Sequence, residues 1–133
     1  MQNLVSKKEE EERRLKALAE YRILGTKPES CYDDITKIAA TTCNVPISLM
    51  TLVDKDKQWF KSKIGLQISE TRRDWSFCTH AIKENSPLII HDAFQDERFI
   101  NNPLVTGDPK IRFYAGFPLR NSDGNKLGTL CVI

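Results

Sequence analysis

Two segments near the N-terminus carry apolar residues at three- and four-residue steps, which predicts amphipathic helices. Residues 9–24 begin in a charged block and gain apolar positions only from Leu15 onward. We therefore expect a helix that starts in solvent and ends against the domain, with Gly25 as the residue that follows its end. Residues 31–43 have acidic residues in their first turn, where the helix dipole favours them, and predict a second helix.

Apolar runs in the remaining chain predict strands. Residues 47–53 are apolar at most positions of both faces, which is typical of a central strand. Residues 58–64 return as its hairpin partner, with Trp59 and Phe60 on opposite faces. Further strands are predicted at residues 88–91, 111–119 and 126–133, the last two joined by an Asp-Gly turn. Gly128 indicates a bulge or the close approach of another backbone.

The order of these elements predicts an α+β domain with helices on one or both faces of an antiparallel sheet. Residues 65–75 show no period, which predicts a loop, and the long connection before residue 111 is of the kind that forms a pocket wall. Because the chain stops at Ile133 inside an apolar strand, we expect it to be a fragment of a longer protein.

Composition and charge are those of an ordinary globular domain. The chain has 133 residues, 40% hydrophobic and 29% charged, which fits one domain with a real core. A net charge of +2 indicates neither a nucleic-acid surface nor a polybasic membrane surface. Since the sequence has no apolar run of about 18 residues and no signal-peptide core, we expect a cytoplasmic protein.

The stretch 74–82 gathers two aromatic residues, a thiol and one of the two histidines. Ser76 predicts the N-cap of a short helix that extends to about Glu84. Cys78 and His80 are able to act as nucleophile and base, but residues two apart on a helix point about 200° apart. The spacing therefore disfavours a catalytic pair.

The four cysteines are scattered, at positions 31, 43, 78 and 131. No two form a CxxC pair, so neither a zinc site nor a redox dithiol is indicated. We expect four buried or half-buried thiols that act as small hydrophobic residues. A metal site built from Cys78, His80, His91 and Asp92 lacks the tight spacing of metal ligands, and no metal is predicted.

Several segments match, in order, the motifs of one known family: Arg14–Leu18 with Tyr21–Leu24, Tyr32–Thr36, Pro46–Asp54, Gln58–Ser62, Ser76–Ile82, Asn102–Gly107, Ile111–Gly116 and Gly128–Ile133. Over residues 13–133 the chain thus resembles a GAF domain of bacterial signalling proteins, truncated before its C-terminal helix. The resemblance implies a GAF/PAS-like (profilin-like) α+β fold, with a central antiparallel sheet flanked by helices. Residues 25–133 would be the GAF domain, and residues 1–24 an N-terminal helix that serves as relay and dimer element.

The resemblance also implies a regulatory sensory domain that is not itself an enzyme and holds no cofactor. Its output module would be a histidine kinase, a diguanylate cyclase or a phosphodiesterase. We expect a homodimer that binds an unknown small molecule or relays a signal, without nucleic acid or membrane as a partner. In the family the ligand lies between the sheet and the helices that cross it. The corresponding positions here are Trp59, Phe60, Asp74, Phe77, Cys78, His80, Asp92, Phe99, Phe113 and Tyr114.

Other functions stay open. Free-methionine sulfoxide reductases resemble GAF domains but rely on several cysteines clustered about one pocket, whereas Cys31, Cys43 and Cys131 fall on a helix, a helix end and a strand. Bilin-binding photoreceptors attach their pigment to a cysteine directly followed by histidine, and here Thr79 intervenes. The aromatic residues also fit a filled core, which would leave a passive dimerisation module.

Overall fold

The computed structural model describes residues 6–133. Along the chain its elements are α1 (Lys7–Glu20), α2 (Ser30–Cys43), β1 (Ser48–Val53), β2 (Lys57–Ile64), β3 (Glu70–Arg72), the 3₁₀ turn η1 (Arg73–Trp75), α3 (Phe77–Ala81), β4 (Leu88–Ile90), the 3₁₀ turn η2 (Ala93–Gln95), α4 (Pro103–Thr106), β5 (Tyr114–Arg120) and β6 (Lys126–Val132). This is the expected α+β architecture, in which two 14-residue helices precede the strands and short helical segments lie between the later strands.

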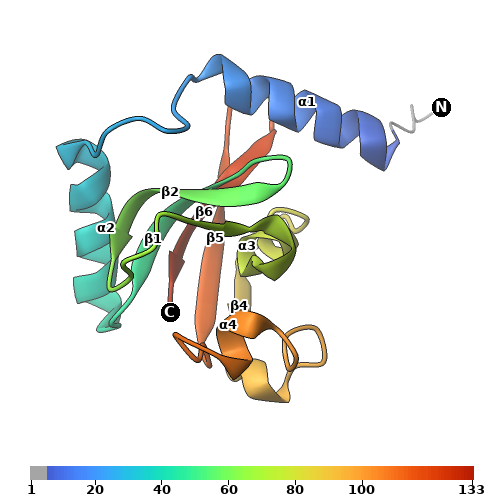
Figure 1. Cartoon of the computed structure of the whole chain (residues 1–133). Helices are drawn as coiled ribbons and strands as arrows, with labels where there is room; N and C mark the ends of the chain where they lie inside the picture. The colour runs from blue at the N-terminus through green and yellow to red at the C-terminus, as the bar shows by residue number, and fades with distance from the viewer. Residues whose placement is uncertain (1–5) are drawn as a thin grey trace.

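The six strands form one antiparallel sheet in the order β3-β2-β1-β6-β5-β4. Helices α1 and α2 lie on one side of this sheet, and α3 and α4 lie on the other (Figure 1). Every residue of β1 is buried, which confirms the prediction of a central strand covered on both faces. The β1–β2 and β5–β6 hairpins are also confirmed.

Two separate hydrophobic clusters fill the two sides of the sheet. The larger cluster joins the inner faces of β1, β2, β5 and β6 to α3, α4 and the connection between β4 and β5. The smaller joins α1 to Leu52 and Leu127, with Ile23, Leu24 and Trp59 packed around it. Trp59 and Phe60 thus lie on opposite faces, as their alternation predicted.

Helix α1 is fixed to the sheet by a buried arginine. Nη1 of Arg14 donates to the backbone carbonyl of Val53 at 2.6 Å, where β1 ends. The other guanidinium nitrogens donate to the carboxylate of Glu11 at 2.9 and 3.0 Å, so that the buried charge is paired. One turn later Ala17 and Leu18 enter the smaller hydrophobic cluster. The described part of α1 is therefore an integral layer of the domain.

Several predicted boundaries were wrong. Helix α1 ends at Glu20 instead of Leu24, because Arg22 takes a left-handed conformation (φ 51°) that reverses the chain and leaves Ile23 and Leu24 to pack against the smaller cluster. Gly25 therefore lies in the connection and not at the helix end. Helix α3 ends at Ala81, before the predicted Glu84.

The loop expected over residues 65–75 contains β3 and η1, since a three-residue edge strand is too short to show a period. The strand expected from residue 111 begins at Tyr114. The backbone of Ile111 and Arg112 pairs instead with Leu104 and Ala93, which ties the long connection to the sheet.

Helix α2 buries less apolar surface than its pattern predicted. Thr36 is its one fully buried residue, while Ile35 and Ile38 are 44% and 65% exposed. By contrast, the inference from Gly128 is confirmed: a Cβ at this position would overlap the carbonyl group of Thr51 on the neighbouring strand. The two central strands approach each other closely at this point.

Candidate functional site

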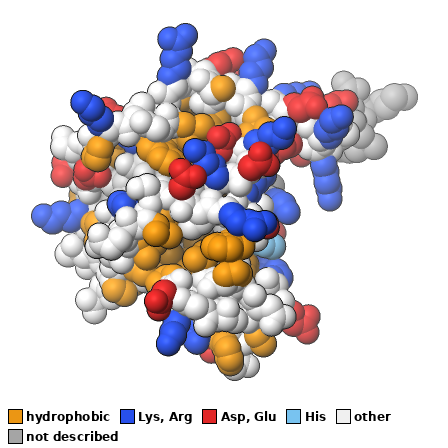
Figure 2. Space-filling view, in the orientation of Figure 1, with side chains coloured by type: hydrophobic (Ala, Val, Ile, Leu, Met, Phe, Trp, Pro, Cys, Tyr) orange, Lys and Arg blue, Asp and Glu red, His pale blue; other side chains and the backbone are white. Residues whose placement is uncertain are grey.

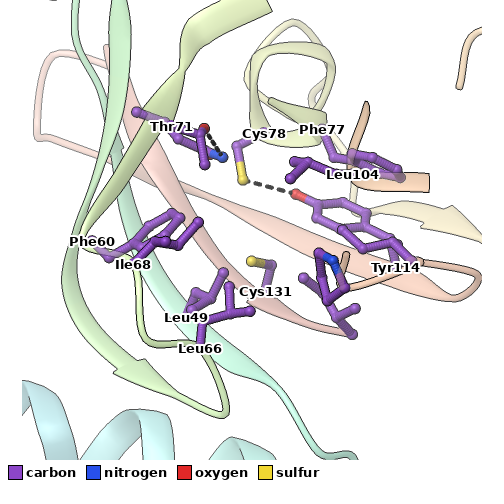
Figure 3. A pocket seen from close by; sticks show the side chains of 14 residues that line it. Leu49, Phe60, Leu66, Ile68, Thr71, Phe77, Cys78, Leu104, Tyr114 and Cys131 are labelled. Atoms are coloured by element: carbon purple, nitrogen blue, oxygen red, sulfur yellow. Dashed lines mark hydrogen bonds between the residues drawn. The ribbon is translucent and has the colours of Figure 1, made fainter. Parts of the chain in front are cut away.

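A mainly apolar cavity lies between the sheet and the helices α3 and α4 (Figure 3). The cavity is narrow: its free volume is about 20 Å³, which is room for about one water molecule. Its lining consists of Leu49, Gln58, Phe60, Leu66, Ile68, Thr71, Phe77, Cys78, Leu104, Pro109, Ile111, Tyr114, Cys131 and Ile133. Ile68 is 46% exposed, so the cavity reaches the surface beside it. An apolar space with few polar groups is the usual form of a small-molecule site.

The polar centre of this cavity is the thiol of Cys78. The hydroxyl groups of Tyr114 and Thr129 donate hydrogen bonds to its sulfur, at 3.2 and 3.1 Å. Thr129 lies 3.1 Å from the hydroxyl of Thr51, which becomes the donor of that pair because Thr129 gives its own proton to sulfur. All four side chains are buried. A chain of hydroxyl groups from β1 and β6 thus ends on the thiol.

The sulfur of Cys131 belongs to the same group of side chains. Burial raises the pKa of Cys78, but the neighbouring Cys131 thiol and the hydroxyl groups of Thr129 and Tyr114 outweigh burial and lower this pKa. The nearby Cys78 thiol, together with burial, raises the pKa of Cys131. Because the hydroxyl groups of Tyr114 and Thr129 donate to the sulfur of Cys78, Cys78 is the thiol of this pair that is favoured as the thiolate.

A buried polar network holds the start of α3 in place. Oγ of Ser76 accepts a hydrogen bond from the backbone nitrogen of Thr79 at 3.3 Å, which confirms Ser76 as the N-cap. The same hydroxyl donates to the side-chain carbonyl of Gln58 at 2.6 Å, and the amide of Gln58 donates to Thr71 at 2.8 Å. The helix that carries Cys78 is thereby joined to β2 and β3.

The ring of Tyr114 owes its position to a glycine. A Cβ at Gly116, two residues along β5, would overlap the hydroxyl and ring carbons of Tyr114. Because the ring is fully buried, it cannot yield to such an atom. Gly116 therefore leaves the space from which the Tyr114 hydroxyl reaches Cys78.

Four of the ten site residues expected from the sequence line this cavity: Phe60, Phe77, Cys78 and Tyr114. Phe99 lies directly behind them, since its ring stacks on that of Phe77 with centroids 4.1 Å apart. The structure thus brings half of the expected set together at one place.

The other five lie elsewhere. The ring of His80 is half-buried and meets Phe99 edge-on at 4.9 Å. Burial, with repulsion from Lys83 and Arg98, lowers the pKa of His80 and favours the neutral ring. Trp59 lies on the opposite face of the sheet. The remaining three, Asp74, Asp92 and Phe113, are exposed at the surface.

Each of the two exposed carboxylates has a local partner. Asp74 accepts hydrogen bonds from Arg72 at 3.0 and 2.7 Å, and Asp92 caps the turn η2 by accepting from the nitrogen of Phe94 at 3.0 Å. Within residues 6–133 no group of three or more His, Cys, Asp or Glu side chains is arranged to hold a metal ion.

Two expectations about the cysteines were wrong: that all four are buried or half-buried, and that none of them cluster about one pocket. Cys31 and Cys43 are exposed on α2 and are not buried hydrophobic residues. Cys131 lines the same cavity as Cys78, because β6 lies at the centre of the sheet beneath α3. Alternation along residues 126–133 does place Thr129 and Cys131 on one face, but that signal alone does not say which face turns toward α3.

A line of polar contacts connects the cavity roof to α1. Arg73, in η1, forms an ion pair with Glu11 of α1. Its backbone carbonyl accepts hydrogen bonds from the hydroxyl of Thr79 at 3.1 Å and the nitrogen of Ser76 at 2.9 Å. Burial raises the pKa of Glu11, but hydrogen bonds from Arg14 and Arg73 outweigh it and lower this pKa to about 2. Glu11 is therefore ionised at neutral pH and joins α1 to the start of α3.

Charged and hydrophobic side chains occupy different parts of the face shown in Figure 2. Charged side chains crowd over α1, and hydrophobic side chains gather in the middle of this face, between α1 and α4. In the part of the chain that the structure covers, no helix is long and apolar enough to cross a membrane.

Both the sequence and the fold of this chain are similar to those of known proteins. The sequence profile described as "GAF domain" matches residues 27–133. A cyclic di-GMP phosphodiesterase from Pseudomonas aeruginosa is 39% identical over 125 residues, which cover 94% of this chain and 21% of that protein. The chain therefore spans about a fifth of the length of this relative.

Solved structures share the fold at low sequence identity. The type II free methionine-R-sulfoxide reductase from Thermoplasma acidophilum superposes with a TM-score of 0.61 at 13% identity, covering 86% of this chain and 75% of that one. The GAF domain of a phosphoenolpyruvate-protein phosphotransferase from Coxiella burnetii has a TM-score of 0.61 at 12% identity, covering 96% and 79%. Likeness at this level concerns the fold alone.

Proposed function

The chain belongs to the GAF domain family, and from this membership we propose that it is the cytoplasmic sensory domain of a bacterial signalling protein. The 39% identical relative is a cyclic di-GMP phosphodiesterase, of which this chain covers 21%. By this proposal the chain is not itself an enzyme. It regulates an output module, and a phosphodiesterase is the output that the relative favours.

The observation that carries this proposal is the cavity beneath α3. Its walls are apolar, and its polar groups gather at Cys78, Tyr114 and Thr71. Such a lining suits a small, largely apolar molecule with one group that forms hydrogen bonds, and the cavity would widen to admit it. Of the expected ligand-binding residues, Phe60, Phe77, Cys78 and Tyr114 are those we propose to contact it.

The proposed signal path is the set of contacts from α3 through Arg73 and Glu11 to α1. A ligand changes the output only if it binds two arrangements of the domain with different affinity. A molecule that shifts α3 would shift η1, and the Glu11–Arg73 ion pair would transmit that shift to α1. Residues 1–24 then serve as relay and dimer element, of which residues 1–5 lie outside the described structure.

A cavity-filling variant tests the ligand. Leu66→Trp places a large ring in the cavity, while Ile89→Trp places the same ring at an exposed position of β4 and serves as control. Mass spectrometry of the denatured proteins should find a co-purified small molecule in the parent and in Ile89→Trp but not in Leu66→Trp. The same compound in all three, or no compound in any after growth in rich medium, would refute a cavity ligand and favour the passive dimerisation module.

Sedimentation tests the dimer. The full chain should sediment as a dimer and the chain lacking residues 1–24 as a monomer. If both forms are the same monomer, α1 is not a dimer element.

A thiol-dependent sulfoxide reductase is the second candidate, favoured by one observation: Cys78 and Cys131 line the same cavity. Incubation with free methionine sulfoxide and dithiothreitol distinguishes the two functions. Turnover by the parent that disappears in Cys78→Ser would establish the enzyme. Equal background rates in both proteins would retain the sensory domain.

A further inference from the structure

In the ligand-binding proposal the two buried cysteines, Cys78 and Cys131, serve only as part of the cavity wall. Cys78 lies at the first turn of α3 and Cys131 on β6, 53 residues later in the chain. Both are fully buried, and both line the cavity that reaches the surface at Ile68. The remaining cysteines, Cys31 and Cys43, are exposed on α2, on the other side of the sheet.

Cys78 is surrounded as a thiolate would be. Its sulfur accepts hydrogen bonds from the hydroxyl groups of Tyr114 and Thr129, and Cys131 lines the same cavity. Thiols that serve only as small hydrophobic groups need no such donors, and apolar burial alone would suppress ionisation. Two hydroxyl donors to one sulfur favour the charged form of that sulfur over the neutral one.

We propose that Cys78 and Cys131 form a hydroperoxide-reactive dithiol, in which Cys78 is the attacking thiol and Cys131 the resolving thiol. This role goes beyond small-molecule sensing, because it requires no resident ligand. It makes oxidation of the domain a signal in its own right.

The chemistry balances within the pair and one hydroperoxide. The thiolate of Cys78 attacks the terminal oxygen of ROOH, so that an S–O bond forms, the O–O bond breaks and RO⁻ leaves to take a proton from solvent. The thiol of Cys131 then attacks the sulfur of this sulfenic acid. An S–S bond forms and the S–O bond breaks, and the hydroxide leaves as water with the proton of Cys131. The thiol pair loses two electrons, and the hydroperoxide is reduced to an alcohol or to water.

The arrangement also explains which cysteine reacts first. The hydroxyl groups of Tyr114 and Thr129 both donate to Cys78 and so favour its thiolate, which is the form that attacks a hydroperoxide. A disulfide would remove the thiolate that Tyr114 and Thr129 contact, and would link the first turn of α3 to the centre of the sheet. Since η1 directly precedes α3, oxidation would act on the same contacts that lead to α1.

The test uses the whole chain with Cys31→Ser and Cys43→Ser, so that only the two buried thiols remain. One equivalent of hydrogen peroxide should lower the intact mass by two hydrogens, and peptide mapping should find the Cys78–Cys131 link, reversible by dithiothreitol. Adding Cys131→Ser should leave a sulfenic acid on Cys78 that dimedone traps. Adding Cys78→Ser should abolish the reaction.

A second measurement separates the proposed site from ordinary thiol oxidation. Tyr114→Phe removes one donor to sulfur and should slow disulfide formation about tenfold at neutral pH, because a hydrogen bond to a charged group is lost. Tyr32→Phe, on α2 and outside the cavity, should leave the rate unchanged. The same protein unfolded in guanidinium should also react at least tenfold more slowly.

Three results would overturn the proposal: two free thiols after peroxide treatment, equal rates in the folded and unfolded protein, or accumulation of sulfinic acid on Cys78 while Cys131 stays free. If the serine variants fail to fold, mapping of the Cys31→Ser, Cys43→Ser protein alone decides. A protein that carries no co-purified ligand but forms this disulfide would uphold the dithiol and refute the ligand proposal independently.

Discussion

Replacing Arg14 by methionine is expected to loosen α1 from the sheet and to lower the free energy of unfolding by about 3 kcal/mol. Methionine keeps most of the apolar stem and removes the guanidinium group. The carbonyl of Val53 then loses its donor, and the carboxylate of Glu11 keeps only Arg73 as a partner. The change therefore tests the contact that fixes the proposed relay helix.

The magnitude follows from the bonds that Arg14 makes. It donates one close hydrogen bond to Val53 and two to Glu11, and bonds to charged groups contribute roughly 1.5–3 kcal/mol each, or about 6 kcal/mol together. Removing the guanidinium also removes the cost of burying it, which offsets roughly half of that sum. The remaining 3 kcal/mol corresponds to a fall in melting temperature of about 10 °C for a domain of this size.

Urea unfolding followed by circular dichroism at pH 7 measures this difference. Arg13→Met is the matched control, because Arg13 is exposed and forms no ion pair within residues 6–133. It should stay within about 0.5 kcal/mol of the parent. If Arg14→Met is as stable as Arg13→Met, the buried arginine does not fix α1, and the proposed path from α3 to α1 loses its anchor.

Three further predictions concern the rest of the domain. Gly116→Ala should lower the free energy of unfolding by about 2 kcal/mol, because the new methyl group collides with the buried Tyr114 ring; an unchanged melting temperature would contradict this. Ser48→Ala should leave stability unchanged or raise it by up to about 1 kcal/mol, because the Ser48 hydroxyl is buried with no hydrogen-bond partner among residues 6–133, whereas Thr129→Val should lose about 1–2 kcal/mol in the same urea titration. The pKa of Glu11 is about 2 in the folded state against an ordinary value of 4.5, so its contribution is fully present above about pH 4.5 and is lost as the pH falls toward 2. Urea titrations of the parent and Glu11→Gln should therefore converge across that window, and a constant difference would refute the ion-pair assignment.

The strands were the most predictable part of the fold. Residues 47–53 are apolar on both faces, and only a strand covered on both sides explains that pattern. The N-cap at Ser76 was equally predictable, because a serine before an apolar helical turn accepts a hydrogen bond from a free backbone N–H of that turn. The sequence therefore predicted those features that depend on one residue or one short segment.

The candidate site was less predictable because it depends on pairings between distant segments. The alternation of β6 puts Thr129 and Cys131 on one face, yet only the place of β6 beneath α3 brings them to Cys78. For helix α2 the spacing correctly predicted a helix, but the burial that it predicted was wrong, because Ile35 and Ile38 are exposed in the described chain. Periodicity tells which residues share a side and not what covers that side.

The place of β6 at the centre of the sheet also governs when this domain is able to form during synthesis. Strand β1 pairs with β6, and Thr51 and Thr129, which meet across that pairing, are separated by 78 residues. A ribosome needs about 4–16 s to make that length of chain, at roughly 5–20 residues per second. Throughout that interval the β1–β2 hairpin has an open edge that is able to pair with other chains. The emergence of β6 therefore joins the two halves of the sheet and, in the same step, completes the hydrogen bonds around Cys78, so that a chain terminated before β6 would lack the site altogether.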